Sequence, residues 1–242
     1  MFGASAREVK NIMDRLLLFD IDGTLARTEN GYLPFNEAIL ETFGVAGDIR
    51  TVIPDGKTDP MIVREIFSKA NIELIVQAHD WERFIGNLVA CYRRHVELGS
   101  TTVRALPGAA ELLCALAGAG AFGLTVVTGN CEATARVKLA AAGLDSFLGR
   151  GAYGNDSAER SDLPALAKHR WEQSTAHAVL AGNCVVIGDT PDDLAAARQN
   201  KMKCLLVGTG RYPVEELEYW RPDACLADLS DTGAVLAVLN SL

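Results

Sequence analysis

Short apolar runs alternate with helical patterns from about residue 106 onward, and this alternation limits the chain to very few folds. The runs expected to form strands are Phe122–Val127, a weaker one near 151–153, Cys184–Ile187, Cys204–Val207 and one after Pro222. The helices expected among them are Ala109–Ala117, Glu132–Ala142, Leu163–Gln173, Pro191–Gln199 and a terminal one. Because each intervening helix returns the chain to the same edge, strands connected in this way pair in parallel. The sequence predicts an α/β fold with helices on both faces of a parallel sheet, to which Leu16–Phe19 adds a strand.

The segment 28–104 has a different pattern. It contains three helical stretches separated by polar turns and no convincing strand; the stretches are Phe35–Phe43, Pro60–Lys69 and Trp81–Glu97. We therefore expect a helical cap domain over 28–104, inserted into a core domain made of 1–27 and 105–242. Because the insertion follows the first strand directly, it should lie over the carboxyl end of the sheet, where open α/β folds bind ligands.

Composition excludes several classes of protein. The 242 residues are 49% hydrophobic and 22% charged, which suits one large globular domain or a domain with an insertion. The net charge is -8 and the lysines and arginines are scattered, so we expect no nucleic-acid partner and no anionic membrane surface. No apolar run approaches the ~18 residues of a membrane span, and the N-terminus lacks the apolar region of a secretory signal, so a cytoplasmic location is expected.

The six cysteines are widely spaced and form no C-x-x-C pair. Several of them lie in apolar runs, where a thiol packs as a small hydrophobic group. We expect reduced thiols in the core in preference to disulfides or a zinc site.

Three of the expected strands end in polar motifs. These are Asp20-Ile21-Asp22-Gly23-Thr24, Thr128-Gly129-Asn130 and Gly188-Asp189-Thr190-Pro191-Asp192-Asp193. Since the carboxyl ends of parallel strands share one edge of the sheet, these motifs should bring carboxylates and a hydroxyl together. So much like charge requires a cation, and an all-oxygen ligand set suits Mg²⁺. Asp-x-Asp-Gly alone is also typical of a turn.

These motifs and their order resemble the haloacid dehalogenase superfamily of aspartate-nucleophile phosphohydrolases. The first two stretches resemble its first two motifs, and Gly188-Asp189-x-x-x-Asp193 resembles its fourth. The resemblance extends over essentially the whole chain and implies a Rossmann-like core. The helical insertion is similar to the cap of the phosphoglycolate phosphatase and β-phosphoglucomutase branch.

The resemblance implies a role for each motif. Asp20 is expected to be the nucleophile that forms an aspartyl phosphate, and Asp22 the general acid and base. Mg²⁺ is expected to bind Asp20, the backbone carbonyl of Asp22 and Asp189, with Asp193 orienting these ligands or joining them. Thr128 and the backbone N–H groups of Gly129 and Asn130 are expected to hold the phosphoryl oxygens.

The third family motif is usually a lysine at the start of a helix, and here the chain departs from the pattern. The matching place is Glu159-Arg160-Ser161-Asp162-Leu163, so Arg160 is expected to take this role, with Lys168 as the other candidate. In the insertion, the polar turn Gly56-Lys57-Thr58-Asp59 could reach the leaving group, and it makes Lys57 a candidate substrate-binding residue.

The resemblance implies Mg²⁺-dependent hydrolysis of a small phosphorylated metabolite, as in phosphoglycolate phosphatase. Asp22 disfavours dehalogenase chemistry, because a halide leaving group needs no acid. A phosphomutase of the β-phosphoglucomutase type stays open, and so does a catalytically silent phosphate-binding protein. A lid over the site favours small substrates. Neither the substrate nor the oligomeric state can be predicted from the residues.

Overall fold

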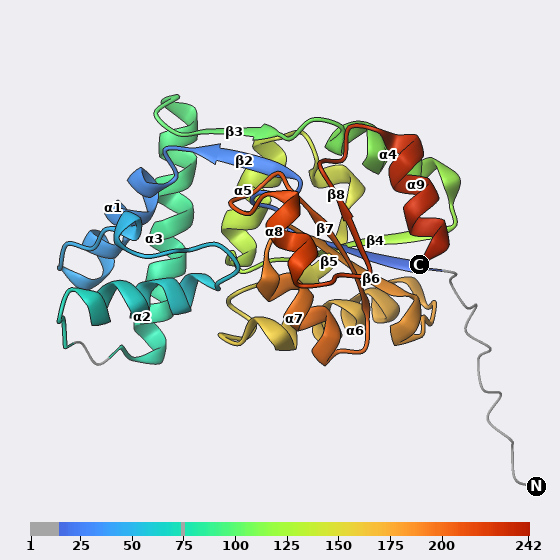
Figure 1. The fold of residues 1–242 in the computed structure, drawn as a ribbon. Coiled ribbons are helices and arrows are strands. Elements are labelled where there is room, and N and C mark those ends of the chain that lie inside the picture. The colour runs from blue at the N-terminus through green and yellow to red at the C-terminus, as the bar shows by residue number, and fades with distance from the viewer. Residues whose placement is uncertain (1–14, 74–75) are drawn as a thin grey trace, which may run out of the picture.

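The computed structural model describes residues 15–73 and 76–242, and it places them in a parallel sheet flanked by helices with a helical group beside it (Figure 1). Within these residues the main sheet has six strands in the order β5-β4-β1-β6-β7-β8, and every neighbouring pair is parallel. The strands are β1 (Arg15–Phe19), β4 (Phe122–Val127), β5 (Gly149–Ala152), β6 (Cys184–Gly188), β7 (Lys203–Val207) and β8 (Ala224–Leu226). The predicted α/β fold is confirmed. Residues 1–14 of the expected core domain lie outside the described residues.

Strand β1 lies near the middle of the sheet, and its side chains alternate between the two faces. Leu17 and Phe19 pack with α4 (Ala109–Ala119), α5 (Glu132–Ala141) and α9 (Thr232–Ser241). Leu16 and Leu18 pack on the opposite face, against the helices α6 (Leu163–Thr175), α7 (Pro191–Gln199) and α8 (Val214–Tyr219). These four side chains are completely buried, so the strand is packed on both faces. The short helix α8 was not expected from the sequence.

The insertion has its own apolar core. Helices α1 (Tyr32–Phe43), α2 (Asp59–Lys69) and α3 (Ala78–Glu97) lie together at one side of the sheet in Figure 1. Their aromatic residues meet edge to face: the ring centroids of Phe43 and Phe67 are 5.1 Å apart, and those of Phe35 and Phe84 are 5.7 Å apart. Such pairs add to the stabilisation from burial. A single 3₁₀ turn, η1 (Ile49–Thr51), lies between α1 and α2.

Two short strands join the insertion to the sheet domain, although the sequence predicted no strand between 28 and 104. β2 (Ala26–Glu29) and β3 (Thr102–Ala105) pair in an antiparallel manner, with Ala26 opposite Ala105. Each strand has four residues and no apolar run, so neither has a recognisable pattern by itself. They form because the chain leaves and re-enters the sheet domain at neighbouring points. Both strands cross the expected domain boundaries.

Four of the cysteines, at 91, 131, 184 and 204, are buried, as expected of thiols that pack as apolar groups, whereas Cys114 is exposed. Among the helices of the described residues, none is long and apolar enough to cross a membrane.

The connections of β1 determine where a ligand can bind. After β1 the chain enters the insertion, then returns to β4 on one side of β1, and later reaches β6 on its other side. The strand order therefore reverses at β1, and open α/β sheets bind ligands at the carboxyl end of such a point. Asp20 is the first residue after β1.

Candidate active site

A cavity of about 370 Å³ opens between the carboxyl end of the sheet and the helices of the insertion. This volume is near the lower limit for small-molecule sites. Most of the predicted site residues line it: Asp20, Asp22, Lys57, Thr128, Gly129, Asn130, Arg160 and Asp189. Asp193 lies beside them, in contact with Arg160. The tertiary structure thus brings together residues from both ends of the sequence, such as Asp20 and Asp193.

Three buried carboxylates form one cluster at the bottom of the cavity. Asp20, Asp189 and Asp193 each offer an oxygen within 4.8 Å of the others, and all three side chains are almost fully buried. Burial raises the pKa of Asp20 to about 7, against the attraction of Arg160 and with the repulsion of Asp193. Burial and the charge of Asp20 raise the pKa of Asp189 to about 9. When ionised, the three carboxylates carry more negative charge than the guanidinium of Arg160 compensates, and this donor set fits Mg²⁺.

Two glycines leave room for the carboxylate of Asp189. A Cβ atom on Gly23 would lie 2.4 Å from Asp189 Oδ2, and Gly23 also has a left-handed φ of +84°. A Cβ atom on Gly210, in the loop after β7, would lie only 1.7 Å from the same oxygen. Thr24 Oγ1 donates to Asp189 Oδ1 at 3.2 Å. The orientation of Asp189 thus depends on two backbone segments that carry no side chain.

Arg160 is the cation of the cluster. It begins the 3₁₀ turn η3 (Arg160–Asp162), and its Nη2 lies 3.1 Å from Asp20 Oδ1 and bonds to Asp193 Oδ1. Asp193 also accepts hydrogen bonds from the backbone N–H and the hydroxyl of Thr190, which caps α7. Lys168 instead pairs with Glu172 on the same helix and does not line the cavity. The geometry therefore favours Arg160 over Lys168 at the third-motif position.

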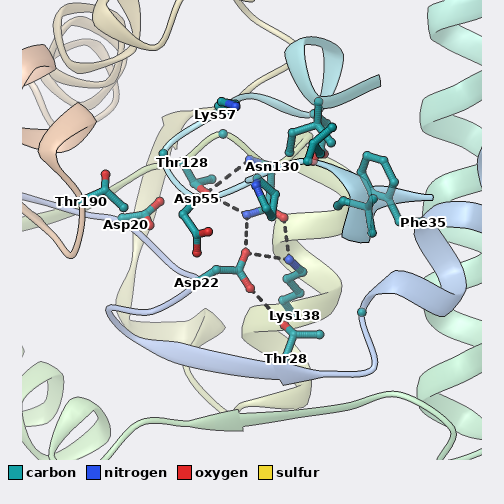
Figure 2. Close-up of a pocket in the computed structure, with 18 of the residues that line it drawn as sticks. Asp20, Asp22, Thr28, Phe35, Asp55, Lys57, Thr128, Asn130, Lys138 and Thr190 are labelled. Atoms are coloured by element: carbon teal, nitrogen blue, oxygen red, sulfur yellow. Dashed lines mark hydrogen bonds and ion pairs between the residues drawn. The ribbon is translucent and has the colours of Figure 1, made fainter. Parts of the chain in front are cut away.

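A second charged network holds Asp22 (Figure 2). The Oδ2 atom of Asp22 accepts from Lys138 Nζ at 2.6 Å and from Asn130 Nδ2 at 2.8 Å, and its Oδ1 atom accepts from the Thr28 hydroxyl at 3.0 Å. Lys138 Nζ also donates to Asn130 Oδ1 at 2.7 Å. Burial alone would raise the pKa of Asp22, but Lys138 and these hydrogen bonds hold it below its ordinary value. Asp22 is thus ionised at neutral pH in this arrangement.

Lys138 was not predicted as a site residue. It lies on α5, where the buried positions Thr134, Ala135, Lys138 and Leu139 follow helical spacing, and its side chain is 5% exposed. A lysine on the buried face of an amphipathic helix needs a partner, and this pattern is visible in the sequence. It could have marked Lys138 as a functional candidate.

The second motif forms a loop before α5. Cys131 precedes the helix as its N-cap, so Thr128 is not a cap; its buried hydroxyl accepts from the backbone N–H and the side-chain amide of Asn130. The polar turn of the insertion docks on this loop. Asp59 donates its N–H to Gly129 O at 2.8 Å, and its carboxylate accepts from Cys131 N at 2.7 Å.

The other residues of this turn also have protein partners. The Thr58 hydroxyl donates to the Ala158 carbonyl at 2.9 Å. Lys57 lines the cavity, but its ammonium group pairs with Glu65 on α2. Thr58 and Asp59 therefore dock the insertion on the sheet domain, whereas Lys57 faces the cavity as an already paired cation.

Comparisons with known proteins agree with this geometry. A family model described as haloacid dehalogenase-like hydrolase matches residues 15–200. The chain is 27% identical over 233 residues to the "Probable phosphatase IndB" of Dickeya dadantii, an alignment covering 94% of this chain and 96% of that protein. It is 26% identical over 223 residues to a 5'-nucleotidase of Pseudomonas aeruginosa, covering 91% of this chain and 94% of the relative.

The fold also matches solved structures. A predicted phosphoglycolate phosphatase from Haemophilus somnus superposes with a TM-score of 0.65 at 20% identity, covering 93% of this chain and 98% of that one. At this sequence identity the structural match supports the fold only. The family model, which spans most of the chain, shows which family the chain belongs to. The chain is a haloacid dehalogenase-like hydrolase, an enzyme of the superfamily that its three strand-end motifs resemble.

Proposed function

We propose that the protein is a Mg²⁺-dependent phosphatase that hydrolyses a small phosphorylated metabolite through an aspartyl phosphate on Asp20. The proposal rests on one observation: Asp20, Arg160 and Asp189 meet at the end of β1, in a cavity that Asp22 also lines. The names of the two curated relatives, a phosphatase and a 5'-nucleotidase, support the same reaction class.

In the first step Asp20 attacks phosphorus. Asp22 first takes up a proton as the negatively charged phosphate binds beside it, because the added negative charge raises the pKa of the carboxylate. A new bond then forms between an oxygen of Asp20 and phosphorus, the bond from phosphorus to the leaving oxygen breaks, and the leaving oxygen receives this proton from Asp22. In the second step Asp22 takes a proton from water, which attacks the aspartyl phosphate and releases inorganic phosphate. Asp20 is regenerated, so protons and charges balance over the cycle.

The surrounding residues position these groups. Arg160 contacts one oxygen of Asp20, and its guanidinium can also contact a phosphoryl oxygen. The hydroxyl proton of Thr128 and the N–H group of Gly129 are available to the other phosphoryl oxygens, whereas the N–H group of Asn130 donates to Thr128 Oγ1. Lys138 and Asn130 hold Asp22 in its ionised form, which suits removal of a proton from water in the second step.

Asp20, Asp189 and the Asp22 carbonyl would hold Mg²⁺, with Asp193 orienting Arg160 beside them. When bound, the ion neutralises charge between the phosphate and the nucleophile. The buried set of three carboxylate oxygens within 4.8 Å of one another is the feature of this chain that fits such an ion.

Phosphate release from a panel of phosphorylated metabolites tests the proposal. Wild type and Asp20→Asn are assayed side by side with Mg²⁺ and with EDTA, and the products are examined for isomerised sugar phosphates. We expect phosphate release by wild type with Mg²⁺ only, and a loss of several orders of magnitude in Asp20→Asn. A phosphoenzyme trapped by rapid acid quench should carry its phosphate on Asp20.

Other outcomes lead to different conclusions. Isomerised products with little free phosphate would show a phosphomutase. Near wild-type turnover by Asp20→Asn would refute the nucleophile, and silence across the panel would favour a phosphate-binding protein.

A further inference from the structure

One wall of the cavity, formed by the insertion, is apolar. Its walls are side chains from α1, α2 and the segment between them, namely Tyr32, Phe35, Ile49, Val52, Pro54 and Ile62. In Figure 2, Phe35 lies across the cavity from Asp20. A phosphate held at Asp20 would therefore direct its leaving group toward this apolar wall. Such a wall favours a hydrocarbon or ring face and gives little to an ionic group.

The cations that line this half of the cavity already have partners. Arg50 forms hydrogen bonds to both carboxylate oxygens of Asp48, one of them at 2.8 Å, and its guanidinium lies 4.3 Å from the ring centre of Tyr32. Lys57 pairs with Glu65. A carboxylate or a second phosphate on the leaving group would have to share one of these cations with its acidic partner.

Asp55 adds a negative charge at the same place. It lines the cavity that holds Asp20, and together with Asp22 it also lines a smaller hollow beside it. Arg211 Nη1 is 3.8 Å from Asp55 Oδ2, a separation at which an exposed pair compensates charge only weakly. An anionic leaving group would meet Asp55 as a like charge, whereas a hydroxyl group could donate a hydrogen bond to it.

We propose that the substrate is a phosphate monoester of an uncharged alcohol with an apolar ring or chain face, and that Asp55 excludes esters whose leaving group carries a second negative charge. The inference rests on the proposed function and narrows its substrate class. Nucleoside monophosphates and ring sugar phosphates share this chemistry, while phosphoglycolate and pyrophosphate do not.

Two matched esters isolate the charge of the leaving group. Benzyl phosphate and 4-carboxybenzyl phosphate have the same ring and the same reacting bond, and they differ by one carboxylate. We expect kcat/KM of the wild-type enzyme with Mg²⁺ to be at least about tenfold higher for benzyl phosphate. Uridine 5'-monophosphate, ribose 5-phosphate and phosphoglycolate are run beside them. Comparison of the first two shows whether the enzyme prefers a nucleoside or a sugar as the leaving group. Phosphoglycolate should have the lowest kcat/KM of the three.

The variant Asp55→Asn keeps the size of the side chain and removes its charge. It should raise kcat/KM for 4-carboxybenzyl phosphate and for phosphoglycolate by about tenfold, and change that for benzyl phosphate by less than about threefold. Asp145→Asn is the matched control, since it makes the same change of net charge at an exposed site away from the cavity. It should leave both values unchanged.

A second variant probes the apolar wall. Phe35→Leu keeps an apolar side chain in the buried position and removes the flat ring. It should raise KM for benzyl phosphate and have little effect on phosphoglycolate.

The two proposals fail in different ways. No phosphate release from any ester, or full activity of Asp20→Asn, would overturn the proposed function. If wild type is active and Asp20→Asn is not, equal or better turnover of 4-carboxybenzyl phosphate, or no response to Asp55→Asn, would overturn the leaving-group assignment alone.

Discussion

Lys138 Nζ lies 2.6 Å from Asp22 Oδ2, so a lysine on the helix after the second motif contacts the second aspartate of the first motif. The ammonium group is buried and also contacts Asn130, and it lies 5.2 Å from the ring centre of Tyr92 in the insertion. Burial of the ammonium group opposes its charge, but Asp22 raises the pKa of Lys138 and keeps it protonated. Lys138 thus contacts Asp22 of the first motif, Asn130 of the second motif and the ring of Tyr92 in the insertion.

Removal of this lysine should change how Asp22 titrates. In Lys138→Met the pKa of Asp22 should rise, because the nearest positive charge is lost, and kcat should fall by about ten- to a hundredfold. The pH profile of kcat/KM checks this: the limb due to Asp22 should move to higher pH in Lys138→Met and much less in Lys138→Arg. Lys168→Met, outside the cavity, is the control and should leave the profile in place. An unchanged pH profile in Lys138→Met would show that Lys138 does not control the pKa of Asp22.

Arg160 should tolerate replacement only by another cation. Arg160→Met leaves Asp20 and Asp193 buried without their partner, and breaking such a buried pair costs about 3–5 kcal/mol of unfolding free energy. Arg160→Lys should keep the fold and lose about tenfold or more in kcat/KM, because one ammonium cannot replace the fork of a guanidinium. Urea unfolding and steady-state kinetics measure the two effects. Equal stability of Arg160→Met and wild type would count against this prediction.

Without Mg²⁺, the protein should become less stable as pH rises from about 5 to about 8. The folded-state pKa values of Asp20 (about 7) and Asp189 (about 9) exceed the ordinary value of 3.8, so the folded protein retains protons that the unfolded chain has released. By linkage, the unfolding free energy then falls as pH rises. Asp22, whose pKa is lowered, is ionised in both the folded and the unfolded protein over this range. It therefore does not contribute to the pH dependence of the unfolding free energy.

Thermal melts in EDTA at several pH values measure how stability changes with pH. At about pH 8, Mg²⁺ should raise Tm by about 3 °C or more, because it binds only the folded cluster. Asp189→Asn should flatten the pH dependence and weaken the response to Mg²⁺. If Tm in EDTA increased with pH, or if Mg²⁺ left Tm unchanged, the prediction that these carboxylates hold protons in the folded state and bind Mg²⁺ would be wrong.

The space beside Asp189 should be essential for metal binding. Gly210→Ala would place a methyl group 1.7 Å from Asp189 Oδ2 and force the carboxylate to move. We expect the Mg²⁺ concentration for half-maximal activity to rise by about ten- to a hundredfold, with a smaller effect on stability. Gly182→Ala serves as the control, because its Cβ would meet open space. The prediction is wrong if both variants have the same Mg²⁺ requirement.

Most of the sheet could be predicted because its strands are buried on both faces. Phe122–Val127 and Pro191–Gln199 have the predicted bounds, since polar residues, glycine or proline mark where each begins or ends. The strands β2 and β3 could not be predicted, because four residues without an apolar pattern become a strand only when the partner segment is brought beside them.

The sequence alone determined the parallel α/β architecture, the helical insertion and the chemical groups at three strand ends, because burial, periodicity and chain connectivity are local or topological properties. Only the tertiary structure decided which cations meet which carboxylates. It paired Arg160 with Asp20, brought Lys138 to Asp22, and left Lys168 outside the cavity with Glu172. Such pairings depend on distances of a few ångströms between segments far apart in the chain, and Coulomb energy in a buried site is sensitive to those distances.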